Sequence, residues 1–306
     1  MKIAVCLYGH LRTWEHCYES LKKNLLDLYD CDVFMHTWDT VDAKTQSWHD
    51  DLIKENCMVA GVCEKLFEKY GLKDLMVETQ ADMSNEYGYY HPVNLPERNV
   101  SIWGVNCMWH SIEQVNSLRL NYQKINDIDY DFIIFTRPDI LFLTNINLVN
   151  YIKDLDMKDI NKALFCFADP IYGNNTPRIN DGRYAAGNDL FFFAKPEIID
   201  NIINNKNCIL NQITDDKTLQ RTVESLVLEL AENLNYKYYF IGYILFGTSL
   251  KTLKVLRHSE INPATVCSHS QTHLQKHTAN LVKIIKSLLH LPQEFASVMF
   301  YLIYRK

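Results

Sequence analysis

The sequence predicts an α/β fold in which a mostly parallel central sheet is flanked by helices. Short apolar segments alternate along the chain with longer segments of helical periodicity, a pattern typical of parallel sheets covered by helices. One apolar segment, Phe132–Thr136, contains no charged residue, as expected of a central strand that is buried on both faces. These two observations predict the fold class.

The first strand is expected over Ile3–Tyr8, and Gly9 ends it. A helix should follow, for which Thr13 is a candidate N-cap. The apolar residues of this helix recur at the spacing of one buried face, namely Trp14, Cys17, Tyr18, Leu21, Leu25 and Leu28. A strand followed directly by an amphipathic helix is therefore the first unit of the predicted fold.

The same alternation continues through the middle of the chain. Strands are expected over Asp32–Thr37 and Leu75–Glu78, with a helix over Cys63–Tyr70 between them. A longer helical pattern over Ser101–Tyr122 leads into the uncharged strand Phe132–Thr136. These segments supply the centre of the predicted sheet.

Two more strands are expected over Leu164–Ala168 and Asp189–Ala194. Helical spacing then recurs at Leu219, Val223, Leu226, Val227, Leu230 and Leu234. Residues 280–306 differ in character, because an apolar stripe is flanked by lysines and the segment ends in Arg305 and Lys306. We expect a domain over residues 1–279 and a basic amphipathic helical tail, which either contacts an anionic membrane peripherally or packs on protein.

Charge and cysteine content exclude several classes of protein. The formal net charge of −6 argues against binding nucleic acid through a general basic surface. The nine cysteines are odd in number and show no zinc-site spacing, so reduced thiols in the cytosol are the simpler interpretation. The apolar N-terminal stretch is too short for a signal peptide. We therefore expect a cytoplasmic protein, with the inner face of the membrane as the site of any peripheral contact.

The most informative motif is Arg137-Pro138-Asp139, directly after the predicted central strand. In open α/β sheets, ligands bind at the carboxyl ends of the strands. This setting, a charged turn between two apolar segments, resembles the Asp-x-Asp turn of GT-A glycosyltransferases. The Arg-x-Asp turn and the early Gly-x-Leu-Arg-Thr segment resemble, more narrowly, bacterial capsule and lipopolysaccharide sugar transferases. The resemblance implies a GT-A-like, Rossmann-type fold.

The resemblance also implies a cofactor and substrates. In that family the two carboxylates hold Mn²⁺ or Mg²⁺ against the diphosphate of a nucleotide sugar, and a glycan or lipid-linked acceptor receives the sugar. Here Arg137 replaces the first carboxylate. Asp139 would then bind the metal with a late histidine, His258, or Arg137 would pair with phosphate oxygens and make a metal unnecessary. A structural Arg–Asp ion pair is the third alternative.

Other candidate donor-binding residues follow predicted strands or lie in loops. Arg12 precedes the first helix, whose N-terminus favours an anion. Asp39 follows the second strand, where the family commonly places an acidic residue that contacts the base or ribose. Tyr89 lies in a tyrosine-rich segment that would suit stacking on a base or sugar. Asn188 and Asp189 end a polar loop of the kind that contacts donor sugar and acceptor in the family.

An inverting transfer needs a carboxylate as general base near the acceptor hydroxyl. Glu224 is the first candidate, because the family often has an acidic residue at the start of its last core helix. Asp189 is the second. A retaining enzyme would need neither.

Alternative functions are transfer of another activated group, such as a phospho-group, onto a glycan, and non-catalytic glycan binding. No phosphate-binding loop of the P-loop type, dinucleotide fingerprint or serine-hydrolase elbow occurs in the sequence.

Overall fold

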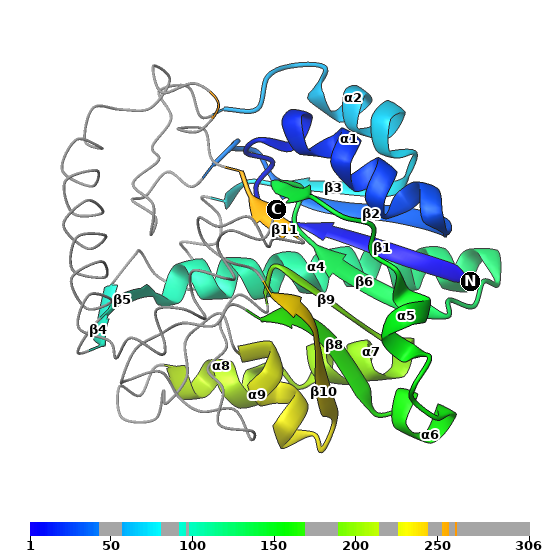
Figure 1. The fold of residues 1–306 in the computed structure, drawn as a ribbon. Helices are drawn as coiled ribbons and strands as arrows, with labels where there is room; N and C mark the ends of the chain where they lie inside the picture. Colours follow the sequence, from blue (N-terminus) through cyan, green and yellow to red (C-terminus); the bar gives the residue numbers. More distant parts are fainter. Residues whose placement is uncertain are drawn as a thin grey trace, which may run out of the picture.

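The computed structural model describes residues 1–42, 57–80, 92–95, 98–168, 189–213, 226–243, 253–256 and 261. A seven-stranded sheet with the order β10-β8-β9-β6-β1-β2-β3 forms its centre (Figure 1). Its strands are β1 (Lys2–Tyr8), β2 (Asp30–Trp38), β3 (Leu72–Glu78), β6 (Phe132–Thr136), β8 (Ala163–Ala168), β9 (Phe191–Ala194) and β10 (Lys237–Tyr243).

Strand β9 runs antiparallel to both of its neighbours, β6 and β8, while the other pairings in this sheet are parallel. The prediction of a mostly parallel sheet flanked by helices is therefore confirmed. Strands β1, β2, β3 and β6 end at the same edge, which we call the carboxyl edge. The antiparallel strand β9 begins there, because Phe191 at its start pairs with Thr136 at the end of β6.

Helices cover both faces of the sheet because successive side chains of each strand point to opposite faces. In β1, Ile3, Val5 and Leu7 belong to one core, and Ala4, Cys6 and Tyr8 to the other. The first core includes residues of α1 (Trp14–Asn24), α2 (Val62–Tyr70), α5 (Leu148–Ile152) and α6 (Met157–Ile160). The second includes residues of α4 (Ile102–Asn126), α7 (Pro196–Asn204), α8 (Asn207–Ile213) and α9 (Leu226–Asn233).

A buried ionic contact joins α4 to α7 within the second core. Arg119 of α4 is fully buried, and its guanidinium donates to the carboxylate of Asp200 on α7. The same guanidinium donates to Asn116 Oδ1 at 2.6 Å and to Gln123 Oε1 at 2.9 Å. Since a buried charge requires partners, Asp200 fixes where α7 lies against α4.

Short strands complete the described part of the chain. Strand β7 (Ile140–Phe142) pairs antiparallel with β11 (Leu253–Val255), and β4 (Pro92–Leu95) pairs with β5 (Arg98–Ser101). Neither β11 nor β10 was expected from the sequence. No helix among the described residues is long and apolar enough to cross a membrane. The eight described cysteines are free.

Two expectations about the first helix need correction. Thr13 occupies the N-cap position, but its hydroxyl donates to the carbonyl of Leu256 at 2.7 Å and makes no cap hydrogen bond. The helix also ends at Asn24, and Leu28 lies in a 3-10 turn (Leu26–Leu28) with 40% of its surface exposed. The first half of the expected last helix and the tail 280–306 lie outside the described residues, so the domain boundary stays a prediction.

Candidate functional site at the carboxyl edge of the sheet

Two arginines meet one buried aspartate at the carboxyl edge. Arg137 donates from Nε to Asp139 Oδ1 at 2.9 Å and from Nη2 to Oδ2 at 2.5 Å. Arg12 donates from Nη1 to Asp139 Oδ2 at 3.1 Å and from Nε to Asp42 Oδ1 at 2.7 Å. The Asp139 side chain is 0% exposed, whereas those of Arg12 and Arg137 are 14% and 15% exposed. We call Arg12 and Arg137 the guanidinium pair.

The chain holds Arg12 in this position through an unusual turn after β1. Gly9 has φ +90°, and Arg12 itself has φ +44°, in the left-handed region that residues other than glycine seldom adopt. The Arg12 N–H donates to the Val41 carbonyl at 2.8 Å. A left-handed non-glycine residue costs about 1–3 kcal/mol and persists where the surroundings require it. The strain therefore coincides with the residue that bridges two carboxylates.

Nearby carboxylates keep Arg12 charged despite its burial. Burial opposes the charged form of Arg12, but the Asp42 and Asp139 carboxylates outweigh it and raise the pKa of Arg12. Two positive and two negative groups thus balance one another. Each guanidinium has five N–H donors, and the contacts given above use two of them on each arginine. Among the described residues, these contacts leave donors on both arginines that an additional anion could use.

Tyr8 and Asp189 lie next to the guanidinium pair. Tyr8 ends β1, and its buried hydroxyl has no hydrogen-bond partner among the described residues. Burial, followed by the nearby Asp189 carboxylate, raises the pKa of Tyr8 well above its usual value. Asp189 precedes β9 and is 8% exposed. Because a buried hydroxyl without a partner is costly, the Tyr8 hydroxyl is a candidate donor to a bound ligand.

His10 lies between this cluster and a second group of polar side chains. Its Nε2 lies 3.0 Å from Gln80 Oε1, and its ring centroid lies 6.4 Å from that of Trp38. Burial, aided by the positive charge of Arg12, lowers the pKa of His10 from 6.5 to about 3. His10 is therefore neutral in the folded protein at physiological pH.

The lowered pKa of His10 predicts a pH-dependent stability. An unfolded chain protonates this histidine below pH 6.5, while the folded chain resists protonation until about pH 3. Stability from this group is therefore complete above pH 6.5 and is lost as pH falls, by about 1.4 kcal/mol per pH unit. As the pH falls from 6.5 to 5, the free energy of unfolding of His10→Gln should therefore decrease by about 2 kcal/mol less than that of the wild type. Urea unfolding at the two pH values measures this difference.

A matched control for this titration is His16→Gln, which replaces an exposed histidine on α1. This variant should keep the wild-type slope. An unchanged slope in His10→Gln would show that another group is responsible.

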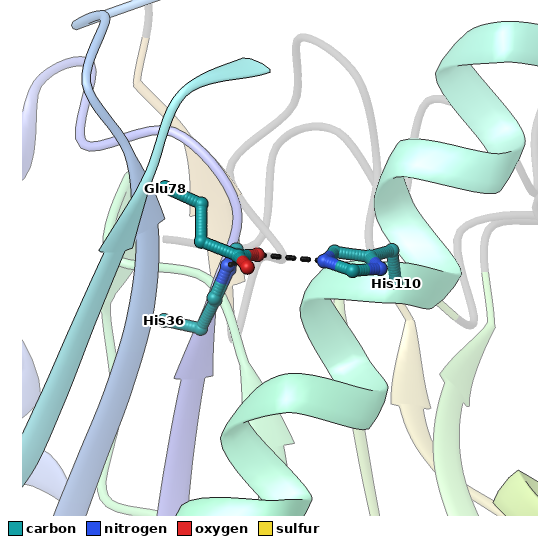
Figure 2. A group of neighbouring side chains, drawn as sticks. All are labelled: His36, Glu78 and His110. Atoms are coloured by element: carbon teal, nitrogen blue, oxygen red, sulfur yellow. Dashed lines mark hydrogen bonds and ion pairs between the residues drawn. The ribbon is translucent and has the colours of Figure 1, made fainter. Parts of the chain in front are cut away.

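The second group consists of two histidines and one glutamate, which we call the His–Glu–His triad. His36 of β2 and His110 of α4 face Glu78, the last residue of β3 (Figure 2). Glu78 Oε2 lies 2.8 Å from His36 Nε2 and 2.6 Å from His110 Nε2. The side chain of His36 is 0% exposed, that of Glu78 is 35% exposed and that of His110 is 15% exposed. The triad thus has a buried inner side and a partly open outer side.

Neighbouring groups fix the orientation of both imidazoles. The Nδ1 atom of His36 lies 2.7 Å from Ser111 Oγ, which also accepts a hydrogen bond from the Gly9 N–H at 2.8 Å. Trp38 packs edge-on against the His36 ring at 5.0 Å and stacks with the His110 ring at 5.8 Å. Neither ring is therefore free to rotate without disturbing the buried Trp38.

Burial and these contacts shift the pKa values of His36 and Glu78. Burial lowers the pKa of His36 from 6.5 to about 4 despite its hydrogen bond to Glu78. Burial acts to raise the pKa of Glu78, but hydrogen bonds from His110 and His36 outweigh it, so this pKa is lowered. The candidate ligand atoms all lie within 4.8 Å of one another. Among the described residues, this cluster could hold a metal ion.

Five of the expected site residues are described, namely Arg12, Asp39, Arg137, Asp139 and Asp189. Arg12 and Arg137 each donate to Asp139, and the Asp189 carboxylate is close enough to affect the pKa of Tyr8, as Arg137 and Asp139 also do. Asp39 makes a different contact, since its Oδ1 accepts from the Gln80 N–H at 3.4 Å. The other four, Tyr89, Asn188, Glu224 and His258, lie outside the described residues.

The expected Mn²⁺ or Mg²⁺ site at Asp139 and His258 stays a prediction, because His258 is not described. The surroundings of Asp139 do not favour a cation, since both carboxylate oxygens accept hydrogen bonds from the guanidinium pair. A divalent ion there would meet two positive charges. The Arg–Asp ion pair considered from the sequence is present.

Four site residues were not expected from the sequence, namely Tyr8, Asp42, Glu78 and His110. A signal existed for Glu78, because it ends an expected strand next to the one that carries His36. Asp42 and His110 gave no such signal, since a loop residue and one helical histidine have no distinctive spacing.

No protein-family model matches this chain, and no curated protein is similar to it in sequence. A glycosyltransferase involved in glycosylation of the major capsid of PBCV-1 has 11% identity, covering 80% of this chain and 81% of its own, at a TM-score of 0.31. An active-site mutant of LgtC has 12% identity, covering 80% of this chain and 72% of its own, at a TM-score of 0.35.

A nucleoside-diphosphate-sugar pyrophosphorylase from Vibrio cholerae has 8% identity, covering 86% of this chain and 98% of its own, at a TM-score of 0.39. Identities and scores this low do not bear on activity. The function has to rest on the chemistry of the carboxyl edge.

Proposed function

We propose that this chain is a glycosyltransferase that moves a sugar from a nucleotide diphosphate to a glycan acceptor. The observation that supports it is the guanidinium pair, which converges on buried Asp139 where β1 and β6 end. Ligands of open α/β sheets bind at this edge. Arginine is suited to phosphate because its planar fork donates two parallel hydrogen bonds.

In this proposal the guanidinium pair binds the diphosphate and stabilises it as the leaving group. Asp139 positions both arginines and, together with Asp42, offsets their positive charges before the donor arrives. The Tyr8 hydroxyl is an additional candidate donor for a phosphate or sugar oxygen. These contacts favour the alternative in which arginine replaces the metal of the Asp-x-Asp turn.

The acceptor side of the reaction rests on carboxylates. Asp189 is buried beside Tyr8 and starts the segment that enters β9, which suits a general base or a contact to the sugar. Glu224 remains the other candidate base. We propose a capsular or lipopolysaccharide glycan, or its lipid-linked precursor, as acceptor, from the Arg-x-Asp resemblance alone.

The proposal predicts that the protein binds one class of nucleotide, tested by calorimetric titration with UDP, GDP, dTDP and CMP. Arg137→Ala should weaken that binding roughly 10- to 100-fold, because a hydrogen bond to a charged group contributes about 1.5–3 kcal/mol. Arg137→Lys should recover only part of the loss, since lysine lacks the planar fork.

The matched control is Lys237→Ala, which removes a positive charge from the start of β10, where its partner is Asp159. Its affinity should equal that of the wild type. If no nucleotide binds, or if Arg137→Ala binds as tightly as Lys237→Ala, the proposed donor site is wrong.

A further inference from the structure

The His–Glu–His triad contributes nothing to the transfer mechanism proposed above, yet it brings three strong metal-ligating groups together. They come from three elements that are far apart in the sequence, namely β2, β3 and α4. Figure 2 shows the Glu78 carboxylate lying between the two imidazoles. Packing of α4 on the sheet does not by itself require two histidines to share one carboxylate, yet Glu78 is the polar partner of both rings.

We propose that His36, Glu78 and His110 bind a divalent transition-metal ion such as Zn²⁺. The ligand atoms are Nε2 of each histidine and Oε2 of Glu78. Two imidazoles with one carboxylate suit zinc and its first-row neighbours, whereas Mg²⁺ requires oxygen ligands. The site is distinct from Asp139, where the guanidinium pair disfavours a cation.

The distances are compatible with such an ion. Tetrahedral zinc lies about 2.0–2.2 Å from nitrogen and oxygen ligands, which places the ligand atoms roughly 3.3 Å from one another. In the triad, Glu78 Oε2 lies 2.8 Å and 2.6 Å from the two nitrogens, and all three atoms fall within 4.8 Å. Both distances from Glu78 Oε2 are shorter than this spacing, so binding an ion requires the carboxylate and the two imidazoles to move slightly apart.

Ser111 lets His36 present the nitrogen that a metal needs. With Glu78 as its partner, His36 carries its proton on Nε2, because a carboxylate only accepts. For Nε2 to bind a metal, the proton must move to Nδ1 and be donated to Ser111 Oγ. A hydroxyl oxygen can accept twice, so Ser111 can accept from His36 and from the Gly9 N–H together. Such outer partners orient metal-bound histidines.

The number of ligands also indicates what the ion would do. Catalytic zinc sites have three protein ligands and leave a fourth position to water or substrate, whereas structural sites use four. The 35% exposure of the Glu78 side chain and the 15% exposure of His110 leave the outer side of the triad partly accessible. An ion here would accept an oxygen ligand at the same sheet edge as the guanidinium pair.

The test is a calorimetric titration of metal-free protein with Zn²⁺, and separately with Mg²⁺. The parent protein carries His269→Ala, His273→Ala and His277→Ala, because those i, i+4 histidines could bind zinc themselves. We expect about one high-affinity zinc per chain and no high-affinity Mg²⁺ site. Glu78→Gln and His110→Ala should each weaken the site roughly 100-fold or more, since losing an outer partner alone costs 10- to 100-fold.

Thermal unfolding gives a second readout, because an ion that binds only the folded chain raises its Tm. His16→Ala, which removes an exposed histidine from α1, should keep both the affinity and the Tm shift. Equal zinc affinity in the parent and in Glu78→Gln would overturn the proposal, as would the absence of zinc binding. No nucleotide is present in the titration, so its result is independent of the donor-site test.

Discussion

Replacing Asp139 with alanine should lower the free energy of unfolding by about 3–5 kcal/mol, measured by urea denaturation. The Asp139 carboxylate is 0% exposed and accepts hydrogen bonds from both members of the guanidinium pair. Its removal leaves Arg137 without this partner and Arg12 with Asp42 alone among the contacts described here. The two guanidinium groups would then repel one another in a largely buried environment, where water screens charges poorly.

Asp27→Ala is the matched control, because it breaks the exposed ion pair between Lys22 and Asp27 on the surface. That change should cost less than about 1 kcal/mol. A similarly small loss in Asp139→Ala would mean that the carboxylate does not organise the arginines. Because Asp139→Ala also perturbs stability, Arg137→Lys is the cleaner variant for measuring the proposed activity.

The second large effect is expected at Asp200, the carboxylate that partners Arg119 between α4 and α7. Asp200→Ala should reduce stability by about 3 kcal/mol, because it leaves the fully buried Arg119 guanidinium without its counter-charge. The lower end of the usual range applies since the Asp200 side chain is 28% exposed. Chemical denaturation with circular dichroism measures the change.

The double variant Arg119→Met with Asp200→Ala provides the internal test. Methionine fills a similar volume without a charge, so the double variant should regain most of the stability that the single variant loses. If the double variant is as unstable as Asp200→Ala, the loss arises from packing of α7 rather than from an uncompensated charge. Nucleotide binding should be unaffected in either variant that folds.

Much of the central sheet was predictable because its strands are short, apolar and separated by amphipathic helices. The expected strand Phe132–Thr136 coincides with β6, and Ile3–Tyr8 differs from β1 by one residue. The missed β10 begins with Lys237 and contains Gly242, and its single neighbour in the sheet is β8. The residues between them, Tyr238–Ile241, are aromatic or β-branched, so the local pattern did contain a strand signal that the prediction did not use.

The guanidinium pair was predictable for a topological reason. Arg12 and Arg137 each follow an apolar strand, and parallel neighbours end at one edge, so their meeting required only that β1 and β6 be adjacent. The position of His110 depends instead on the rotation of α4 relative to the sheet. Periodicity identifies the buried face of a helix but not which flanking residue meets Glu78.

The reversed direction of β9 has a consequence for how the specificity of this fold could change. The six parallel strands all end at one rim of the sheet, and the antiparallel strand β9 begins at the same rim. Every strand of the sheet thus has a connection there that can be lengthened or exchanged while both apolar layers stay intact. Substrate preference could therefore be redesigned by grafting connections at this rim, with the sheet retained as an unaltered platform.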